Sequence, residues 1–271
     1  MSIPNKAAER IRGELKRFQP IIQAAKARDV NESDTVVIVT DLLQYIFGYD
    51  KYNEITSEHM IRGTFCDLAV KIGGSLAFLL EVKSIGTELK DGHVKQAIDY
   101  AANQGVEWVG LTNGQIWRIY KVTFSKPIEF EVVVDIDLLS MSHRDTEAIE
   151  YLGMFAKEGW QRARLAEHHA HRQVLSKYTL AAVILSEPVL DVMRRQLRRI
   201  SAETKIGEEE LRKCLQVDVL KREVLEGEKA TTAARQVSRA ENRALRKSKD
   251  EDSEKTETQA ATAGVPAIVP A

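Results

Sequence analysis

The sequence of 271 residues contains only two cysteines, Cys66 and Cys214, which lie far apart and show no Cys-x-x-Cys spacing. This scarcity argues against a disulfide framework or a structural zinc site, and it fits a reducing cytoplasm. No apolar run approaches the roughly 20 residues that a membrane helix needs. The charged N-terminal segment also lacks the apolar stretch of a signal peptide. We therefore expect a cytoplasmic protein without a membrane span.

An excess of charge of one sign is also missing. The 39 Lys and Arg residues balance 40 Asp and Glu residues, so the formal net charge is -1. Any surface that binds DNA must therefore come from local clustering of Lys and Arg. The composition is that of an ordinary globular protein, and the length allows one large domain or two small ones.

Up to about residue 140 the sequence mixes helical and extended patterns. Apolar residues at helical spacing and capping residues predict helices at 5–28, 34–47 and 91–103. Short apolar runs bounded by turn residues predict strands at 52–56, 64–72, 76–82, 107–112, 115–122 and 128–135. This order predicts an α/β fold, in which helices flank a mixed sheet.

From residue 145 onward the patterns become almost wholly helical. The predicted helices cover 146–166, 170–186, 189–201 and 208–225. We therefore divide the chain into an α/β domain over 1–140, a helical domain over 141–226, and a basic helix with a disordered tail over 227–271. We expect the helical domain to serve in oligomerisation or in contact with DNA.

Two charged residues, Glu81 and Lys83, end the apolar strand predicted at 76–82. They share one face because side chains alternate along a strand, and burying them without partners is costly. If residues 73–75 form a three-residue turn, Asp67 faces Glu81 across the hairpin, at roughly 5 Å between the Cβ atoms. A two-residue turn would instead place Asp67 beside Leu80, on the wrong face.

Two carboxylates that close repel each other unless a positive group lies between them. A hard divalent cation, Mg²⁺ or Mn²⁺, is the natural partner. We expect Asp67, Glu81 and the backbone carbonyl near Val82 to hold this cation. Lys83 would then orient or deprotonate a water molecule, or stabilise charge in the transition state. The alternative is a cross-strand cluster of Asp, Glu and Lys that only holds the sheet together.

Four short patterns surround these residues: Arg62-Gly63 leading to Asp67, Glu81-Val82-Lys83, Gln96 with Tyr100, and Leu-Thr-Asn-Gly at 111–114. Together, over about residues 30 to 122, they resemble the N-terminal nuclease domain of type I restriction enzyme R subunits, a branch of the PD-(D/E)xK superfamily. The proline of that name is absent, since Cys66 precedes Asp67. The resemblance implies a restriction-endonuclease-like fold and a Mg²⁺-dependent endonuclease that cuts DNA in restriction or genome defence.

The resemblance also implies roles for three further residues. Gln96 and Tyr100 are four residues apart on one helix face, and in the family this pair lies beside the metal and positions the active site or the DNA backbone. An acidic residue at the place of Glu32 reaches toward the metal in the family. The alternatives are an ordinary helix surface with Tyr100 packed on the sheet, and a first-turn Glu32 that the helix dipole favours.

One motif of complete R subunits is missing, because the sequence has no G-x-x-x-x-G-K-[ST] loop for an ATP-driven motor. We therefore expect a stand-alone nuclease, or one whose motor a partner subunit supplies. The sequence leaves two alternatives open. The chain could be a catalytically silent binding or assembly subunit that forms a homo-oligomer through its helical region, and the substrate could be RNA.

Overall fold

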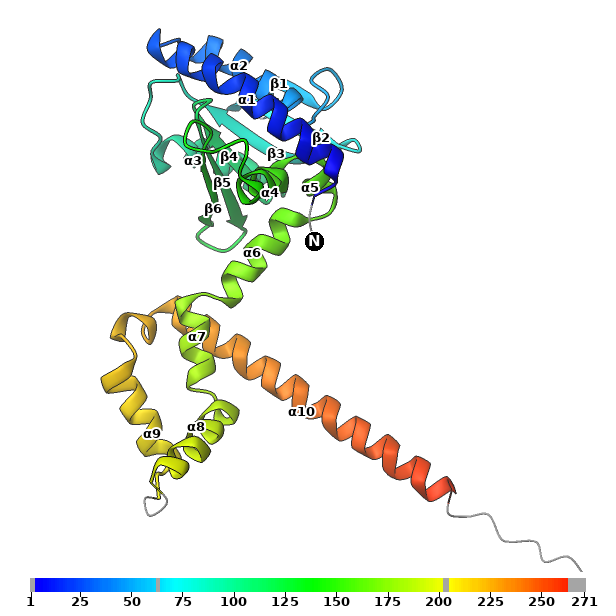
Figure 1. Ribbon diagram of the computed structural model, residues 1–271, viewed down its shortest axis with the longest axis vertical. Coiled ribbons are helices and arrows are strands. Elements are labelled where there is room, and N and C mark those ends of the chain that lie inside the picture. The colour runs from blue at the N-terminus through cyan, green and yellow to red at the C-terminus, as the bar shows by residue number, and fades with distance from the viewer. Residues whose placement is uncertain (1–2, 62–63, 202–204, 263–271) are drawn as a thin grey trace, which may run out of the picture. The chain divides into compact units, whose positions relative to one another are not determined.

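The computed structural model describes residues 3–61, 64–201 and 205–262 (Figure 1). The chain forms two compact units, Met1–His169 and Ala170–Ala271, which are described separately below. Among the described residues, no helix combines the length and apolar character that crossing a membrane requires.

The first unit is built on a six-stranded mixed sheet in which the strands follow their order along the chain. The strands are β1 (Ile55–Ile61), β2 (Thr64–Ile72), β3 (Ser75–Val82), β4 (Trp108–Thr112), β5 (Ile116–Thr123) and β6 (Glu129–Asp137). Only β3 and β4 run parallel, and α3 (Asp91–Gln104) makes the crossover that a parallel pair requires. The predicted α/β class is confirmed, although β1 begins later than the predicted strand 52–56.

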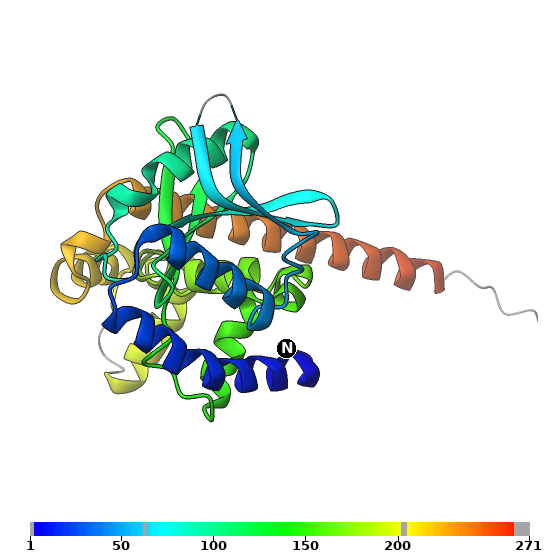
Figure 2. The same cartoon turned by 90° about the horizontal axis from the view of Figure 1, so that it is seen from above.

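Helices cover both faces of this sheet. On one face α1 (Asn5–Ala27) and α2 (Glu32–Tyr45) lie side by side (Figures 1 and 2) and share a core with α4 (Thr146–Phe155). The buried residues of α1 recur at helical spacing, which explains why this segment forms an amphipathic helix. On the other face α3 packs a separate core against β2 to β5.

The first unit extends beyond residue 140, where the sequence suggested a boundary. The α4 residues Ile149, Leu152 and Phe155 are buried in the same core as α1 and the sheet. Phe155 also contacts Phe47 edge-on, with ring centroids 5.1 Å apart. The predicted helix 146–166 is interrupted, and α5 (Lys157–Gln161) begins after an extended Ala156. Because their apolar side chains are buried in this core, α4 and α5 belong to the first unit rather than to the predicted helical domain.

The second unit is helical, as the sequence indicates. The helix α6 (Arg164–Val174) begins in the first unit and ends in the second. The second unit continues with α7 (Lys177–Ile184), α8 (Glu187–Ile200), α9 (Glu208–Cys214), the short helical segments Leu215–Val219 and Arg222–Val224, and α10 (Glu228–Thr262). Its buried cluster contains Leu190, Leu211 and Leu215. A basic helix with a disordered tail was predicted over 227–271, but α10 continues to Thr262, because Ala, Glu, Lys and Gln favour helix. The rest of that predicted tail, 263–271, lies outside the described residues.

Candidate active site

The candidate site lies where the two parallel strands end. The backbone N–H of Lys83, just after β3, donates to the carbonyl oxygen of Thr112 at the end of β4, at 2.8 Å. The carboxyl ends of β3 and β4 therefore meet at one edge of the sheet. In open α/β sheets this edge, outside the carboxyl ends of the strands, is where ligands commonly bind.

The turn between β2 and β3 is tighter than the sequence suggested. Gly73 and Gly74 adopt positive φ angles of 59° and 83°, and Ile72 pairs with Ser75 across the turn. Positive φ at both central positions is typical of a two-residue hairpin turn. The prediction of a three-residue turn is therefore wrong, and this turn alone would put Asp67 on the wrong face.

A register shift in β3 restores the expected pairing. Ala77 is an extra residue between two paired positions, and beyond it Leu68 pairs with Leu80. One extra residue of this kind, a β-bulge, moves the register of the following pairs by one. The next position on each strand then brings Asp67 opposite Glu81, which is the arrangement predicted from the sequence.

The carboxylate of Asp67 is fixed to the end of β3. Its Oδ2 accepts a hydrogen bond from the backbone N–H of Val82 at 2.7 Å. The preceding residue, Cys66, is fully buried and its thiol donates to the carbonyl oxygen of Leu80. Burial, together with the charges of Glu81 and Asp67, raises the pKa of the Cys66 thiol to about 12. Cys66 is therefore a neutral packing residue rather than a thiolate ligand.

Lys83 lies between two carboxylates from different elements. Its Nζ is 2.8 Å from Oε1 of Glu81 and 3.4 Å from Oε2 of Glu32. Glu32 begins α2, whose N-terminus is capped by the Asn31 side chain accepting from the Asp34 N–H. Glu32 thus lies in the first turn of α2 and its carboxylate contacts Lys83, while its approach to a metal stays a prediction.

The charges at this edge influence one another. Burial raises the pKa of Glu81, and the charges of Asp67 and Glu32 add to this effect, while the hydrogen bond from Lys83 opposes it. Burial lowers the pKa of Lys83, but its hydrogen bond to Glu81 and the nearby carboxylates outweigh this, so the pKa rises overall. Among the described residues, the carboxylates of Glu81 and Glu32 contact the Lys83 ammonium group and that of Asp67 lies on the neighbouring strand, and carboxylates gathered in this way favour a divalent cation.

The loop that follows β3 is held by a buried asparagine. The Asn113 side-chain amide donates to the carbonyl oxygens of Ile85 and Thr87, at 3.3 and 2.9 Å. Its Oδ1 accepts from the backbone N–H groups of Gln115 and Ile116, at 3.2 and 2.8 Å. The asparagine of the Leu-Thr-Asn-Gly pattern thus holds the loop that continues from Lys83, a role that sequence reasoning missed because it used this pattern only as part of the family resemblance.

Gln96 and Tyr100 lie on α3, which covers the face of the sheet opposite α1 and α2. Tyr100 is buried in the core between α3 and the sheet, whereas Gln96 is exposed one turn earlier. Tyr100 shares this buried cluster with Cys66, the strand residue that precedes Asp67, and burial raises the pKa of the Tyr100 hydroxyl. Tyr100 therefore packs on the sheet. Arg62 and Gly63, the remaining residues of the family pattern, lie outside the described residues.

The carboxylate and carbonyl oxygens at this edge are of the chemical type that a magnesium ion binds. Among the described residues, no group of three or more His, Cys, Asp or Glu side chains is arranged to hold a metal. Mg²⁺, however, is usually held by one or two carboxylates while water and substrate phosphates complete its shell. Asp67 and Glu81, with the carbonyl near Val82, match that requirement.

Comparisons of the chain with protein-family models, with curated proteins and with solved structures found no match. Function is therefore inferred from the geometry of this edge and from the sequence patterns around it. The resemblance to restriction R subunits stays a prediction.

Proposed function

We propose that this chain is a metal-dependent endonuclease that hydrolyses DNA phosphodiester bonds. In this proposal it has a restriction-endonuclease-like fold, is a stand-alone relative of the nuclease domain of type I restriction R subunits, and acts in restriction or genome defence. The supporting observation is the convergence of Asp67, Glu81, Lys83 and Glu32 at the carboxyl ends of the parallel strands.

In the proposed reaction water attacks the phosphorus atom and the bond from phosphorus to the leaving sugar oxygen breaks. The water gives up one proton, and the leaving oxygen gains one. Asp67 and Glu81 would hold Mg²⁺ or Mn²⁺, which when bound neutralises charge on the scissile phosphate. Lys83 lies 2.8 Å from Glu81, where its nitrogen can orient the attacking water or donate to a phosphate oxygen.

The remaining contacts hold these groups in place before substrate arrives. The Val82 N–H donates to one oxygen of Asp67, and Glu32 at the start of α2 contacts Lys83. Asn113 fixes the loop that continues from Lys83. Groups that are already oriented stabilise developing charge without reorganising during the reaction, which is a large source of catalysis.

The test is nicking of supercoiled plasmid by purified protein with Mg²⁺ or Mn²⁺. Lys83→Ala should lower the rate by about 10²- to 10³-fold, the usual effect of removing one charge-stabilising donor. Asp67→Asn should do the same while still accepting from Val82 N–H. The matched control is Lys90→Ala, since Lys90 lies in the loop after β3 with 68% of its side chain exposed. Nicking that persists unchanged in both site variants would overturn the assignment.

The second candidate is a catalytically silent subunit that binds or assembles with a partner. It is favoured by the absence of a three-ligand metal cluster from the described residues and by the pairing of Lys83 with two carboxylates. It predicts no cleavage of plasmid or of RNA with any divalent cation, no functional loss in Glu81→Gln, and a stable oligomer or co-purifying partner. Running DNA and RNA in parallel also separates the two nuclease substrates.

A further inference from the structure

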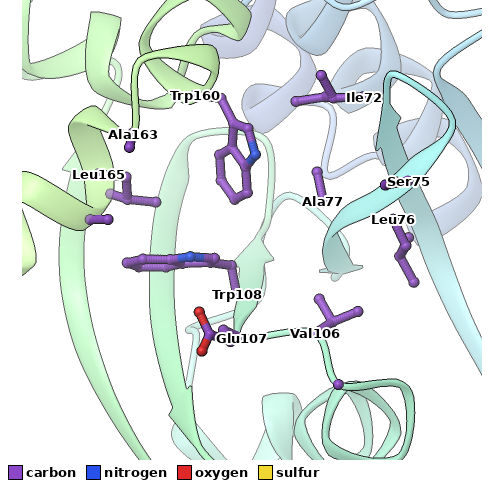
Figure 3. Close-up of a pocket in the computed structure, with 12 residues that line it drawn as sticks. Ile72, Ser75, Leu76, Ala77, Val106, Glu107, Trp108, Trp160, Ala163 and Leu165 are labelled. Carbon is purple, nitrogen blue, oxygen red and sulfur yellow. The ribbon is translucent and has the colours of Figure 1, made fainter.

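A pocket of about 430 Å³ lies at the opposite end of the parallel strands from the candidate active site (Figure 3). Its walls come from the β2–β3 turn region, the start of β4, and the segment from α5 into α6. The lining residues used below are Ile72, Ala77, Glu107, Trp108, Trp160 and Ala166. The size lies within the range of small-molecule sites, roughly 300 to 1,000 Å³.

Two tryptophans form a fixed aromatic corner in this pocket. The rings of Trp108 and Trp160 are 6.1 Å apart and steeply inclined, at 73°. Trp160 packs against Phe78, with ring centroids 4.9 Å apart, and Trp108 is 8% exposed. Figure 3 shows the two rings among the residues that line the pocket. The indole rings are therefore held rigid by the core, and they present π faces and edges to the pocket.

The indole N–H groups of Trp108 and Trp160 differ from that of Trp117 in their hydrogen bonding. The Trp117 indole N–H donates to the carbonyl oxygen of Gly114 at 3.2 Å. Within residues 3–61, 64–201 and 205–262, no hydrogen bond from the indole nitrogen of Trp108 or Trp160 is found. In Figure 3 the Trp160 nitrogen lies on the ring edge that faces Ile72 and Ala77. The pocket thus offers hydrogen-bond donors that an occupant could accept.

The charged groups beside Trp108 are already paired. Nζ of Lys121 lies 2.6 Å from the Glu107 carboxylate and 4.8 Å from the centre of the Trp108 ring. Figure 3 shows Glu107 on the side of Trp108 away from Trp160. The carboxylate lining the pocket is therefore engaged by a lysine, so the pocket offers aromatic faces and N–H donors more than acceptors.

We propose that this pocket binds a nucleobase. A nucleobase is flat, stacks on an aromatic side chain whatever its sequence, and carries ring nitrogens or carbonyl oxygens at its edge to accept from an indole N–H. A sugar fits less well, because its hydroxyl donors need acceptors and Glu107 is paired with Lys121. The base comes from a free nucleotide or from a single-stranded nucleic acid, and the test distinguishes these sources.

The site stands apart from the proposed nuclease site, so the two are tested separately. Binding is measured by quenching of tryptophan fluorescence and by calorimetry, in EDTA and in the Lys83→Ala background, so that no cleavage occurs. The probes are AMP, UMP, an eight-residue oligothymidylate, and glucose as the sugar. Binding of the mononucleotides as tightly as the oligomer identifies free nucleotides as the source, and much tighter oligomer binding identifies a single strand.

Two variants test the location. Ala166→Trp fills the pocket and leaves both indoles in place, while Trp160→Leu keeps apolar bulk but removes the ring and its N–H. Both should weaken binding about tenfold or more, the effect expected for loss of one stacking platform. The matched control is Glu167→Trp, because Glu167 is the exposed neighbour of Ala166 on α6 and does not line the pocket. This control should bind like the parent.

The outcome is decided by Ala166→Trp, whose fold is checked by thermal unfolding. Parent-like binding by a folded Ala166→Trp would overturn the proposal, as would absence of binding to any nucleotide probe or equal affinity for glucose. Plasmid nicking that survives in Ala166→Trp, together with base binding that survives in Lys83→Ala, would show that the two sites are independent. Failure of either proposal then leaves the other standing.

Discussion

The two ends of the β3–β4 pair are built from opposite kinds of side chain. At the carboxyl ends Asp67, Glu81 and Lys83 gather with Glu32 in a charged cluster. At the amino ends Trp108 and Trp160 line an aromatic pocket. One crossover helix joins the strands, so a single parallel pair presents two edges that can carry unrelated chemistry. The comparison shows that the side chains at each end of a strand pair can differ in chemistry although both ends belong to the same two strands.

The two ends are also held by different forces. The charged end depends on buried hydrogen bonds, with Thr112 and Asn113 among the buried polar residues just behind it. The aromatic end depends on packing of Trp160 against Phe78 and on the anchoring of α5. Disrupting each support separately tests whether the two ends respond as the structure predicts.

The largest effect is expected at the charged end, from Asn113→Ala. This change leaves two carbonyl oxygens and two N–H groups without their partner, and Asn113 is only 4% exposed. The expected loss is about 3 kcal/mol in the free energy of unfolding, measured by urea denaturation. Asn103→Ala, at an exposed site where the side chain makes one local bond to Asp99, should cost less than about 0.5 kcal/mol. Equal losses would contradict the role of Asn113.

A smaller and pH-dependent effect is expected at the aromatic end, from Glu158→Gln. The guanidinium of Arg10 contacts both Glu158 oxygens, at 2.6 and 2.8 Å, and so ties α5 to α1. This hydrogen bonding lowers the pKa of Glu158. A depressed pKa in the folded state gives stability that is present above the unfolded-state pKa and is lost as the pH falls through the folded-state pKa.

Both side chains of this pair are about 30% exposed, so solvent screening limits the contribution to about 0.5 kcal/mol. Unfolding of Glu158→Gln and of the parent should therefore differ near pH 7 and converge as the pH falls below the titration of Glu158. The control is Glu167→Gln, which removes an exposed carboxylate on α6 and should leave the free energy of unfolding near pH 7 within about 0.5 kcal/mol of the parent. A difference in the free energy of unfolding between Glu158→Gln and the parent that grows as the pH falls would contradict the lowered pKa of Glu158.

Much of the fold follows from local patterns, and the exceptions have physical causes. The strands and the helices α1 to α3 lie close to their predicted positions, because apolar periodicity reflects which face is buried. The register that places Asp67 opposite Glu81 was predicted through the wrong turn length. A bulge at Ala77 leaves no mark in an apolar strand, so sequence reasoning could not separate a longer turn from a shorter turn with a bulge.

Contacts between distant segments were the hardest to predict. The approach of Glu32 to Lys83 was expected only from the family resemblance, because it depends on how α2 packs on the sheet. The meeting of Trp108 and Trp160 had no local signal at all, since tertiary packing of α5 creates it. The same packing places α4 and α5 in the first unit, past the predicted boundary at residue 140.

The most direct test of the charged end is where a divalent cation binds. Anomalous diffraction from Mn²⁺-soaked crystals should show a peak between Asp67 and Glu81, at about 2.2 Å from their carboxylate oxygens. The peak should be lost in crystals of Asp67→Asn. Mn²⁺ found elsewhere, or nowhere, in crystals of protein that nicks plasmid under the same conditions would contradict the proposed metal centre.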